Sequence, residues 1–389
     1  GLRSSPRSWW KTLDGFIKCL HFKACILEPC LYHMIYKGER MYLTIYVDDI
    51  IILCRNVDYI KEIKAMFCAR FDMTDEGEME HFLNVRVTRT ATSLGLDQSV
   101  YAQKIVDHNA HLLGTRTRKS PLPADAADRL RASVDAEPTP EQQAFLDNFP
   151  FRNLLGALLY LAMNTRPDVA YAVGVLARHG NKPTVESCLL MVHLLQYVRG
   201  TVNKGIRFSN DCFDMHIFTD ADWAGDQITR KSTTGFIVFA AGGPISWQSK
   251  LQPTVATSSM QSEYQALYAG MQEIVWLRGV LAELKLPMSE PTPFFLDSQS
   301  AQDRATNPVY HKRSKHIEIK YHWVREHVDP DGEFKTAELH HVSTLNMSAD
   351  IYTKSLVGPL FIGHCKRNLG ETTLSSAKVK QSNCKRSRR

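Results

Sequence analysis

A helical pattern of apolar residues extends from Ser259 to Leu284, and it constrains the fold more than any other segment of the chain. The apolar positions of this pattern are Tyr264, Leu267, Met271, Ile274, Trp276, Leu277 and Leu281. Such a helix needs an apolar surface to cover. A strand at Met215–Thr219 and a hairpin of Gly235–Phe239 with Ile245–Gln248 precede the helix, and a strand at Pro293–Leu296 follows it. Strands first, then helix and strand in alternation, predict a mixed β-sheet with helices packed on it.

Changes in composition divide the chain into five parts. The first part mixes strands with an amphipathic helix, and the third is helical, with Pro167 at the first position of one helix and Thr184 as the cap of the next. Proline and small polar residues at Ser120–Pro123 and Glu137–Pro140 predict an exposed connection between them. The predicted parts are residues 1–112, 113–140 (linker), 141–205 (helical), 213–357 (mixed sheet and helices) and 358–389 (basic tail). The fold class that follows is α+β or α/β, in several domains.

The composition argues against several classes of protein. No run of about 18 apolar residues is present, so we expect no membrane partner, and the first residues lack both an initiator Met and a secretory signal. The nine cysteines include no Cys-x-x-Cys pair, which favours reduced thiols in a cytosolic or nuclear protein over disulfides or a zinc site. The tail from Lys378 to Arg389 carries basic charges only. It is either a phosphate-binding or nuclear-import patch or a solvated end.

Two adjacent aspartates stand between two apolar strands. Met41–Tyr46 and Ile50–Leu53 predict a hairpin, with Asp48 and Asp49 at its turn. Adjacent carboxylates repel each other unless a cation neutralises them, and a divalent ion such as Mg²⁺ prefers carboxylate and phosphate oxygens. The pair is therefore either a metal-binding turn or an ordinary solvated one.

The surroundings of these aspartates resemble the reverse transcriptases of copia-type retrotransposons. Tyr46–Asp49 is similar to the active-site run that many reverse transcriptases carry on a hairpin of the palm. Gly1–Trp10, Glu76–Leu83 and Gly95–Tyr101 also resemble segments of this family. The resemblance implies that Asp48 and Asp49 are metal-binding residues of a polymerase site that acts on template–primer nucleic acid. It also implies upstream Pol and Gag segments in an intact element.

We expect the polymerase site to be partial. Nucleotidyl transfer with two metal ions needs a third carboxylate, which in this family comes from a strand N-terminal to the region where the sequence begins. The fingers, which hold the incoming nucleotide in the family, also belong to that region. The resemblance thus implies a partial reverse-transcriptase palm in residues 1–112, thumb or connection helices in 141–205, and no polymerase activity from this chain alone.

The helical part offers arginines to a nucleic-acid backbone. Residues 152–168 resemble the connecting segment of the same family. Arg166, Arg178 and Arg199 either touch phosphates or are ordinary surface residues.

Four acids in residues 213–357 stand at the ends of expected strands or the starts of expected helices. Asp220 and Asp297 end strands, Glu263 lies in the first turn of the long helix, and Asp350 lies near the start of a short final helix. Taken singly, each is also the kind of residue that caps a helix or lies on the surface. If they converge, they cannot all be ionised without cations, so convergence implies a metal site.

The order Asp, Glu, Asp and Asp resembles that of ribonucleases H, whereas integrase-like nucleases on the same fold have Asp, Asp and Glu. Arg230–Phe236, Ser258–Tyr264 and Asn307–Glu318 are similar to segments of the copia-type ribonuclease H domain. The resemblance implies cleavage of the RNA strand of RNA:DNA hybrids. It also implies two Mg²⁺ (or Mn²⁺) ions about 4 Å apart. The carboxylates that would hold them are Asp220, Glu263, Asp297 and Asp350.

Further residues are candidates for contact with the hybrid. The predicted nucleic-acid-binding residues are Ser232, Thr233, Gln261, Ser298, Lys312, Arg313, Lys315 and His316. His340 and His341 either assist product release or are structural. Asp222 and Asp226 are interpreted as surface or loop-stabilising groups.

Two readings of the function remain open at this point. The first is a ribonuclease H carried by a partial polymerase, located in cytoplasmic virus-like particles, in the nucleus, or in both. The second is a catalytically inactive remnant of a retroelement that at most binds nucleic acid. The complete set of four acids favours the first reading, and the missing N-terminal third of the polymerase favours the second.

Overall fold

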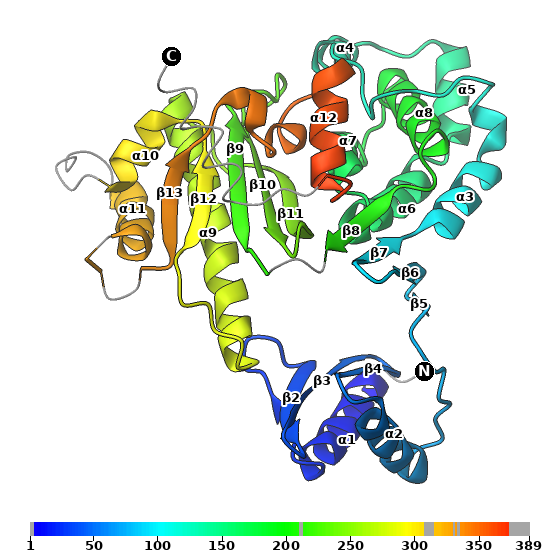
Figure 1. The fold of residues 1–389 in the computed structure, drawn as a ribbon. Helices are drawn as coiled ribbons and strands as arrows, with labels where there is room; N and C mark the ends of the chain where they lie inside the picture. The colour runs from blue at the N-terminus through cyan, green and yellow to red at the C-terminus, as the bar shows by residue number, and fades with distance from the viewer. Residues whose placement is uncertain (1–3, 210–212, 307–314, 330, 333–334, 373–389) are drawn as a thin grey trace. The chain divides into compact units, whose positions relative to one another are not determined.

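The structure, a computed structural model, describes residues 4–209, 213–306, 315–329, 331–332 and 335–372. It divides into two compact units (Figure 1). Residues 1–79 with 275–290 form unit 1, and residues 80–274 with 291–389 form unit 2.

Unit 1 is a four-stranded antiparallel sheet with helices, in the strand order β1-β2-β3-β4. Its elements are α1 (Ser5–Cys19), β1 (Lys23–Ala24), β2 (Leu31–Tyr36), β3 (Glu39–Tyr46), β4 (Asp49–Cys54) and α2 (Val57–Arg70). Alternate residues of β3, such as Met41 and Leu43, are buried against α1 and α2, where Ile17 and Phe67 lie in the same core. The predicted hairpin at residues 41–53 is confirmed.

The last turns of helix α9 (Ser259–Glu283) belong to unit 1. Glu283 Oε2 accepts a hydrogen bond of 2.6 Å from the Ile26 backbone. The Leu284 carbonyl oxygen accepts one of 3.4 Å from the Tyr42 hydroxyl. The end of this helix is therefore bonded to the β1–β2 connection and to β3 of the small sheet.

The N-terminal half of unit 2 is a second antiparallel sheet with a group of helices. Its elements are β5 (His81–Phe82), β6 (Val85–Arg89), β7 (Ser93–Asp97), α3 (Ser99–His108), η1 (Ala110–Leu112), α4 (Ala126–Ser133), α5 (Pro140–Asn148), α6 (Phe151–Asn164), η2 (Pro167–Val169), α7 (Ala170–Ala177), α8 (Val185–Arg199) and β8 (Gly205–Ser209). The sheet order is β5-β6-β7-β8. Thr184 caps α8 as predicted, because its hydroxyl accepts a hydrogen bond from the Ser187 backbone.

Two features of this half differ from the predicted division of the chain. Strand β7 pairs with β8, so residues expected in the first part share a sheet with the end of the third. Residues 113–140, expected as an exposed connection, contain helix α4, and Leu122 and Leu130 are buried in the core. Proline and small polar residues predicted the turns, but these two buried leucines attach the segment to the helices.

The C-terminal half of unit 2 is the predicted mixed sheet, in the order β11-β10-β9-β12-β13. Its elements are β9 (His216–Asp222), β10 (Thr233–Ala240), β11 (Gly243–Leu251), α9, β12 (Thr292–Leu296), α10 (Gln299–Thr306), α11 (Lys315–Val328), β13 (Ala337–His341), η3 (Thr344–Asn346), η4 (Asp350–Tyr352) and α12 (Gly358–Asn368). Strands β11, β10 and β9 are antiparallel, whereas β9, β12 and β13 are parallel. The predicted hairpin, long helix and following strand are confirmed.

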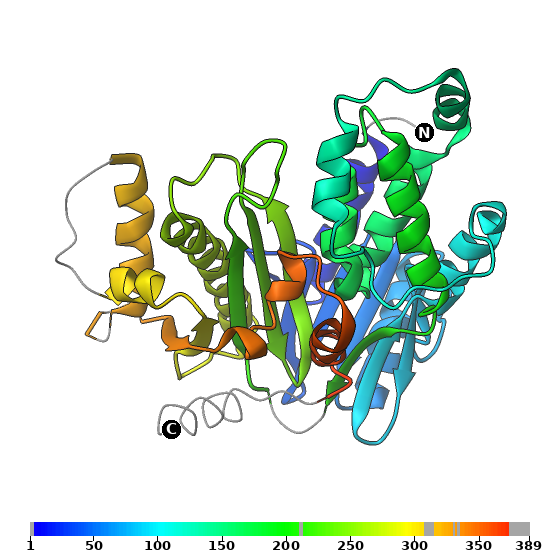
Figure 2. The ribbon, with the colours of Figure 1, turned by 90° about the horizontal axis from the view of Figure 1, so that it is seen from above.

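Helices cover both faces of this sheet: α9, α10 and α11 lie on one side, and α7 and α12 on the other (Figures 1 and 2). The side chains of Phe218 and Ile237, from neighbouring strands, belong to the same core as Leu158 of α6 and Tyr197 of α8. The helical part predicted at residues 141–205 and the mixed sheet therefore share one hydrophobic core.

Two observations bear on the expectations drawn from composition. Of the helices in the described part of the chain, none has the length and apolar character needed to cross a bilayer. The cysteines within the described residues are free thiols, including the buried Cys25, Cys188 and Cys365.

Candidate metal centre

Asp220 and Asp297 are brought together by the pairing of two parallel strands. Phe218 of β9 is the register partner of Phe295 of β12. Side chains two residues apart on a strand point to the same face, so Asp220 and Asp297 both project from the face that carries the two phenylalanines. Asp220 lies within β9 and is 1% exposed, and Asp297 directly follows the last residue of β12.

Glu263 reaches the same place from helix α9, and a glycine makes its approach possible. A Cβ at Gly270 would lie 2.6 Å from Thr219 and 2.9 Å from Ile217 of β9, so only glycine lets the helix pack this closely on the strand. Glu263 lies two turns before Gly270 and therefore on the same face of the helix. Glu263 lies beyond the first turn of α9, and that turn holds no acidic residue. The predicted first-turn position of Glu263 is therefore wrong.

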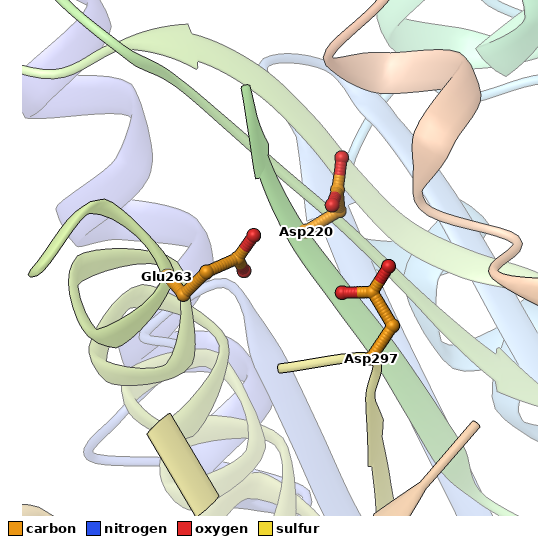
Figure 3. A group of neighbouring side chains, drawn as sticks. All are labelled: Asp220, Glu263 and Asp297. Atoms are coloured by element: carbon orange, nitrogen blue, oxygen red, sulfur yellow. The ribbon is translucent and has the colours of Figure 1, made fainter. Parts of the chain in front are cut away.

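The three carboxylates converge. One ligand oxygen each from Asp220, Glu263 and Asp297 lie within 4.8 Å of one another. Figure 3 shows the Glu263 side chain extending from its helix toward the two aspartates. An all-oxygen set of carboxylates is the type that Mg²⁺ and Mn²⁺ prefer, so these residues fit a divalent cation.

Burial and mutual repulsion perturb these acids strongly. Burial, followed by the charges of Asp220 and Asp297, raises the pKa of Glu263 to about 9. Burial and the charge of Asp220 also raise the pKa of Asp297. Acids whose pKa values are raised by burial and by neighbouring carboxylates are typical of a site that binds a cation.

Asp350, the fourth predicted acid, joins the cluster through two neighbours. Lys354 Nζ lies 3.0 Å from Asp350 Oδ1 and 3.3 Å from Asp220 Oδ2, and the Thr353 hydroxyl donates to Asp220 Oδ2. A Cβ at Gly235, the register partner of Asp220, would lie 2.7 Å from Thr353, so glycine is needed where this segment meets the sheet. Burial and the charge of Asp220 raise the pKa of Asp350 to about 7.

These pKa shifts predict that cation binding is coupled to proton release. Carboxylates bind metal in their deprotonated form, and Glu263 and Asp350 hold protons near neutral pH. We expect Mg²⁺ affinity to rise with pH up to about pH 9. Calorimetric titration in two buffers of different ionisation enthalpy measures the protons released. An affinity that does not change with pH contradicts the expectation.

Two predicted substrate contacts differ from the structure. Ser232 is 0% exposed, and its hydroxyl accepts a hydrogen bond from the Ala224 backbone. Thr233 is 1% exposed, and its hydroxyl accepts one from Arg178. Both side chains are buried, and both hydroxyls accept hydrogen bonds from other parts of the protein, so they do not lie on the surface.

The other two predicted polar contacts lie at helix starts near the acids. The Gln261 amide oxygen accepts hydrogen bonds from the backbone and hydroxyl of Thr257, both 2.7 Å long. The Ser298 hydroxyl accepts one from the Ala301 backbone at the start of α10. Both are partly exposed, and their contact with nucleic acid stays a prediction.

The two histidines have different surroundings. His341 Nε2 donates to the Asp297 carbonyl oxygen over 3.1 Å, and Thr344 donates to the Asp297 carboxylate over 3.1 Å. His340 lies 3.0 Å from Glu338 and packs against Phe295. His341 thus contacts the backbone of a candidate acid, and the role of both histidines stays a prediction.

The predicted basic run is only partly covered. Lys312 and Arg313 lie outside the described residues. Lys315 and His316 fall at the start of α11, with side chains outside the described part. The basic tail is described only to residue 372 and begins with helix α12.

Asp48 and Asp49 lie at the turn between β3 and β4, as predicted, and are exposed. Val47 has a φ of 56°, a strained conformation for a β-branched residue, and its carbonyl oxygen accepts a hydrogen bond of 2.8 Å from Trp9. Within the described residues, no third metal-binding side chain gathers with the two aspartates. Their role in a partial polymerase site stays a prediction.

The three arginines of the helical part form ion pairs or hydrogen bonds within unit 2. Arg166 is 1% exposed and pairs with Asp168, so it is not a surface phosphate contact. Arg178 lies 3.7 Å from Asp226 and also bonds Thr233. Arg199 donates to the carbonyl oxygens of Gly114 and Arg116.

Asp226 stabilises the β9–β10 loop, as interpreted from the sequence. Its carboxylate accepts hydrogen bonds from the Ile228 backbone and the Thr229 hydroxyl. Asp222 lies closer to the acidic cluster, and burial raises its pKa.

Comparison with known proteins identifies the family to which the chain belongs. Residues 1–124 match the family model described as reverse transcriptase (RNA-dependent DNA polymerase). A retrovirus-related Pol polyprotein from transposon TNT 1-94 of Nicotiana tabacum is 35% identical over 91% of this chain and 26% of its own length. An uncharacterized mitochondrial protein of Arabidopsis thaliana is 36% identical over 61% of this chain and 94% of its own length. The chain belongs to the copia-type retrotransposon Pol family.

Copia-type Pol polyproteins are much longer than this chain. The Pol polyprotein from transposon RE1 of Arabidopsis thaliana is 31% identical over 92% of this chain but only 23% of its own length. The chain thus spans about a quarter of the length of such polyproteins.

Solved structures show weaker likenesses. A foamy viral protease–reverse transcriptase in complex with dsDNA aligns with a TM-score of 0.43 at 14% identity, over 88% of this chain and 59% of that chain. LC11-RNase H1 aligns with a TM-score of 0.27 at 15% identity, over 36% of this chain and 92% of that chain. At these scores, the family assignment rests on the sequence relatives alone.

Sequence reasoning missed three residues of this Pol chain that contact the acids: Thr344, Thr353 and Lys354. Lys354 had a detectable signal, because it follows Asp350 by four residues in a segment expected to be helical. The threonines gave no such signal, because their contacts join residues distant in the sequence.

Proposed function

We propose that this Pol chain is a ribonuclease H, which hydrolyses the RNA strand of RNA:DNA hybrids with divalent cations bound at Asp220, Glu263, Asp297 and Asp350. The observation that carries the proposal is the convergence of the first three carboxylates within 4.8 Å from two strands and a helix. The order of the four acids in a Pol family member supports the same chemistry.

The chain's own residues would hold and orient the reacting groups. Divalent cations at these oxygens would lower the pKa of a bound water and stabilise the charge on the phosphate and the leaving oxygen. Asp220, as the common neighbour of the other acids, fixes the centre of the site. Thr344 and His341 orient Asp297 through its carboxylate and its backbone carbonyl.

A groove beside the acids supports nucleic acid as the substrate. It has a volume of about 660 Å³, and its lining includes Lys354, Asp222, Arg131, Trp223 and Arg230. Arg131, Arg230 and Trp223 are exposed, and cationic with aromatic side chains suit a nucleic-acid backbone and its bases. The proposal takes the 2′-hydroxyl of RNA as the feature that selects the strand.

Cleavage of a labelled hybrid tests the proposal. The purified chain, incubated with Mg²⁺ and an RNA:DNA hybrid labelled on the RNA, is expected to cut the RNA and to leave a DNA:DNA duplex intact. We expect Asp297→Asn to reduce the cleavage rate at least about 100-fold. Asp303→Asn is the matched control, because this acid is exposed on α10 and is expected to leave the rate unchanged.

The alternative of an inactive nucleic-acid-binding remnant gives a different result in the same experiment. An intact hybrid that still shifts in a native gel, in Mg²⁺ as well as Mn²⁺, supports the remnant and contradicts the nuclease.

A further inference from the structure

Lys354 is a cationic side chain that lies between two acids of the candidate metal centre, Asp220 and Asp350. Its Nζ lies 3.0 Å from Asp350 Oδ1 and 3.3 Å from Asp220 Oδ2. The side chains of Asp220 and Asp350 are 1% and 2% exposed, so both carboxylates depend on protein partners for their charge. Lysine thus bridges two buried acids that the metal-dependent reaction would also use.

The bridge has the geometry of a substitute for a cation. A divalent ion held by both Asp220 and Asp350 would compete with Nζ for the carboxylate oxygens that Nζ now contacts. An ammonium group and a divalent ion cannot occupy that space together, and their charges repel each other.

The Lys354 side chain also borders a groove into which it can move. It is 34% exposed, and it lines the same groove as Arg131 and Arg230. Its unbranched four-carbon stem turns at several bonds, so the amine can leave the two carboxylates for the groove without movement of the backbone.

We propose that Lys354 is an internal counter-ion of the metal centre: it holds Asp350 against Asp220 when no divalent cation is bound, and a cation that bridges these acids displaces its amine into the groove. The inference rests on the proposed metal centre but not on hybrid cleavage. Lys354 is a positioning residue, and it sets how tightly the centre binds its cation.

The proposal predicts that loss of the lysine charge lowers the stability of the cation-free protein but raises its affinity for cations. Without divalent cations, loss of the lysine charge leaves two buried acids without their partner, so the protein becomes less stable. In the presence of cations, the same loss removes a competitor, so binding becomes tighter. A residue that merely supports the fold would lower the stability without improving the affinity.

Calorimetric titration with Mn²⁺, without nucleic acid, is the test. We expect Lys354→Gln to lower the Kd for Mn²⁺ about tenfold and to reduce the melting temperature in EDTA. Lys354→Arg, which keeps the charge, is expected to restore the melting temperature but not to tighten binding. Lys204→Gln is the matched control, because Lys204 pairs with Glu371 at 3.0 Å in the same unit. An unchanged or higher Kd in Lys354→Gln overturns the proposal.

A measurement on the unaltered protein keeps the proposal testable if Lys354→Gln does not fold. Acetylation of lysines by an amine-reactive ester, read by mass spectrometry, is expected to increase several-fold at Lys354 when Mn²⁺ is added, and to stay constant at Lys204. Equal labelling of Lys354 with and without Mn²⁺ contradicts the displacement. Because neither measurement involves a hybrid, a chain that fails to cleave RNA can still confirm the role of Lys354.

Discussion

Replacement of Asp220 by Asn is expected to reduce hybrid cleavage by roughly 1000-fold or more. Asp220 is the acid on which the others depend, since its charge contributes to the raised pKa of Glu263, Asp297 and Asp350. It also receives the hydrogen bond of Thr353 and the charge of Lys354. Its loss therefore removes a proposed metal ligand and disturbs the other proposed ligands, whereas Asp297→Asn affects one edge of the site.

The same substitution is expected to alter how the stability of the metal-free protein depends on pH. The folded pKa values of Glu263 and Asp350, about 9 and about 7, lie above the ordinary values of 4.5 and 3.8. The folded state therefore binds more protons than the unfolded state between these limits. The stabilisation from these protons is complete below about pH 4 and is lost as the pH rises through about 7 and about 9.

Asn at position 220 removes a charge that contributes to both shifts, so we expect a smaller loss of stability between pH 5 and pH 9. For each such carboxyl, the unfolding free energy of the unaltered protein can fall by up to about 1.4 kcal/mol per pH unit. Urea denaturation in EDTA across this pH range measures the slope. A slope as steep in Asp220→Asn as in the unaltered chain contradicts the assignment of Asp220 as the central charge.

Replacement of Arg166 by Ala is expected to destabilise unit 2 by about 3–5 kcal/mol. The Arg166 guanidinium donates two hydrogen bonds of 2.8 Å to Asp168, and the pair is 1% and 0% exposed. Tyr197 also donates to Asp168, over 2.6 Å. Burial favours the neutral form of Asp168, but the Arg166 charge outweighs it and lowers the pKa of Asp168. Truncation of the arginine therefore leaves a buried carboxylate charge without its partner.

Two further variants separate this effect from ordinary loss of packing. The double substitution of Arg166→Met with Asp168→Leu removes both charges and is expected to recover most of the lost stability. Arg86→Ala breaks a pair with Asp97 in which the arginine and aspartate side chains are 44% and 11% exposed, and is expected to cost about 1 kcal/mol. Chemical denaturation measures all of them. An Arg166→Ala loss as small as that of Arg86→Ala contradicts the importance of the buried pair.

The local patterns of the sequence determined which segments form which elements. Apolar periodicity predicted the hairpin at Asp48–Asp49, helix α9 and the strand before Asp297, because burial on one face leaves a repeat in the sequence. The position of an acid at the end of a strand indicated where Asp297 would project. The capping hydroxyl of Thr184 and the loop-stabilising Asp226 are likewise local, since their partners lie within a few residues.

The tertiary structure decided how these segments come together. The pairing of Phe218 with Phe295 sets two aspartates side by side, and Gly270 and Gly235 let α9 and the η4 segment approach them. No local pattern showed that Ser232 and Arg166 are buried or that Lys354 also contacts Asp220. The physical reason is range: burial periodicity and capping act within a few residues, whereas the charges and packing of the metal centre depend on contacts between segments far apart in the chain.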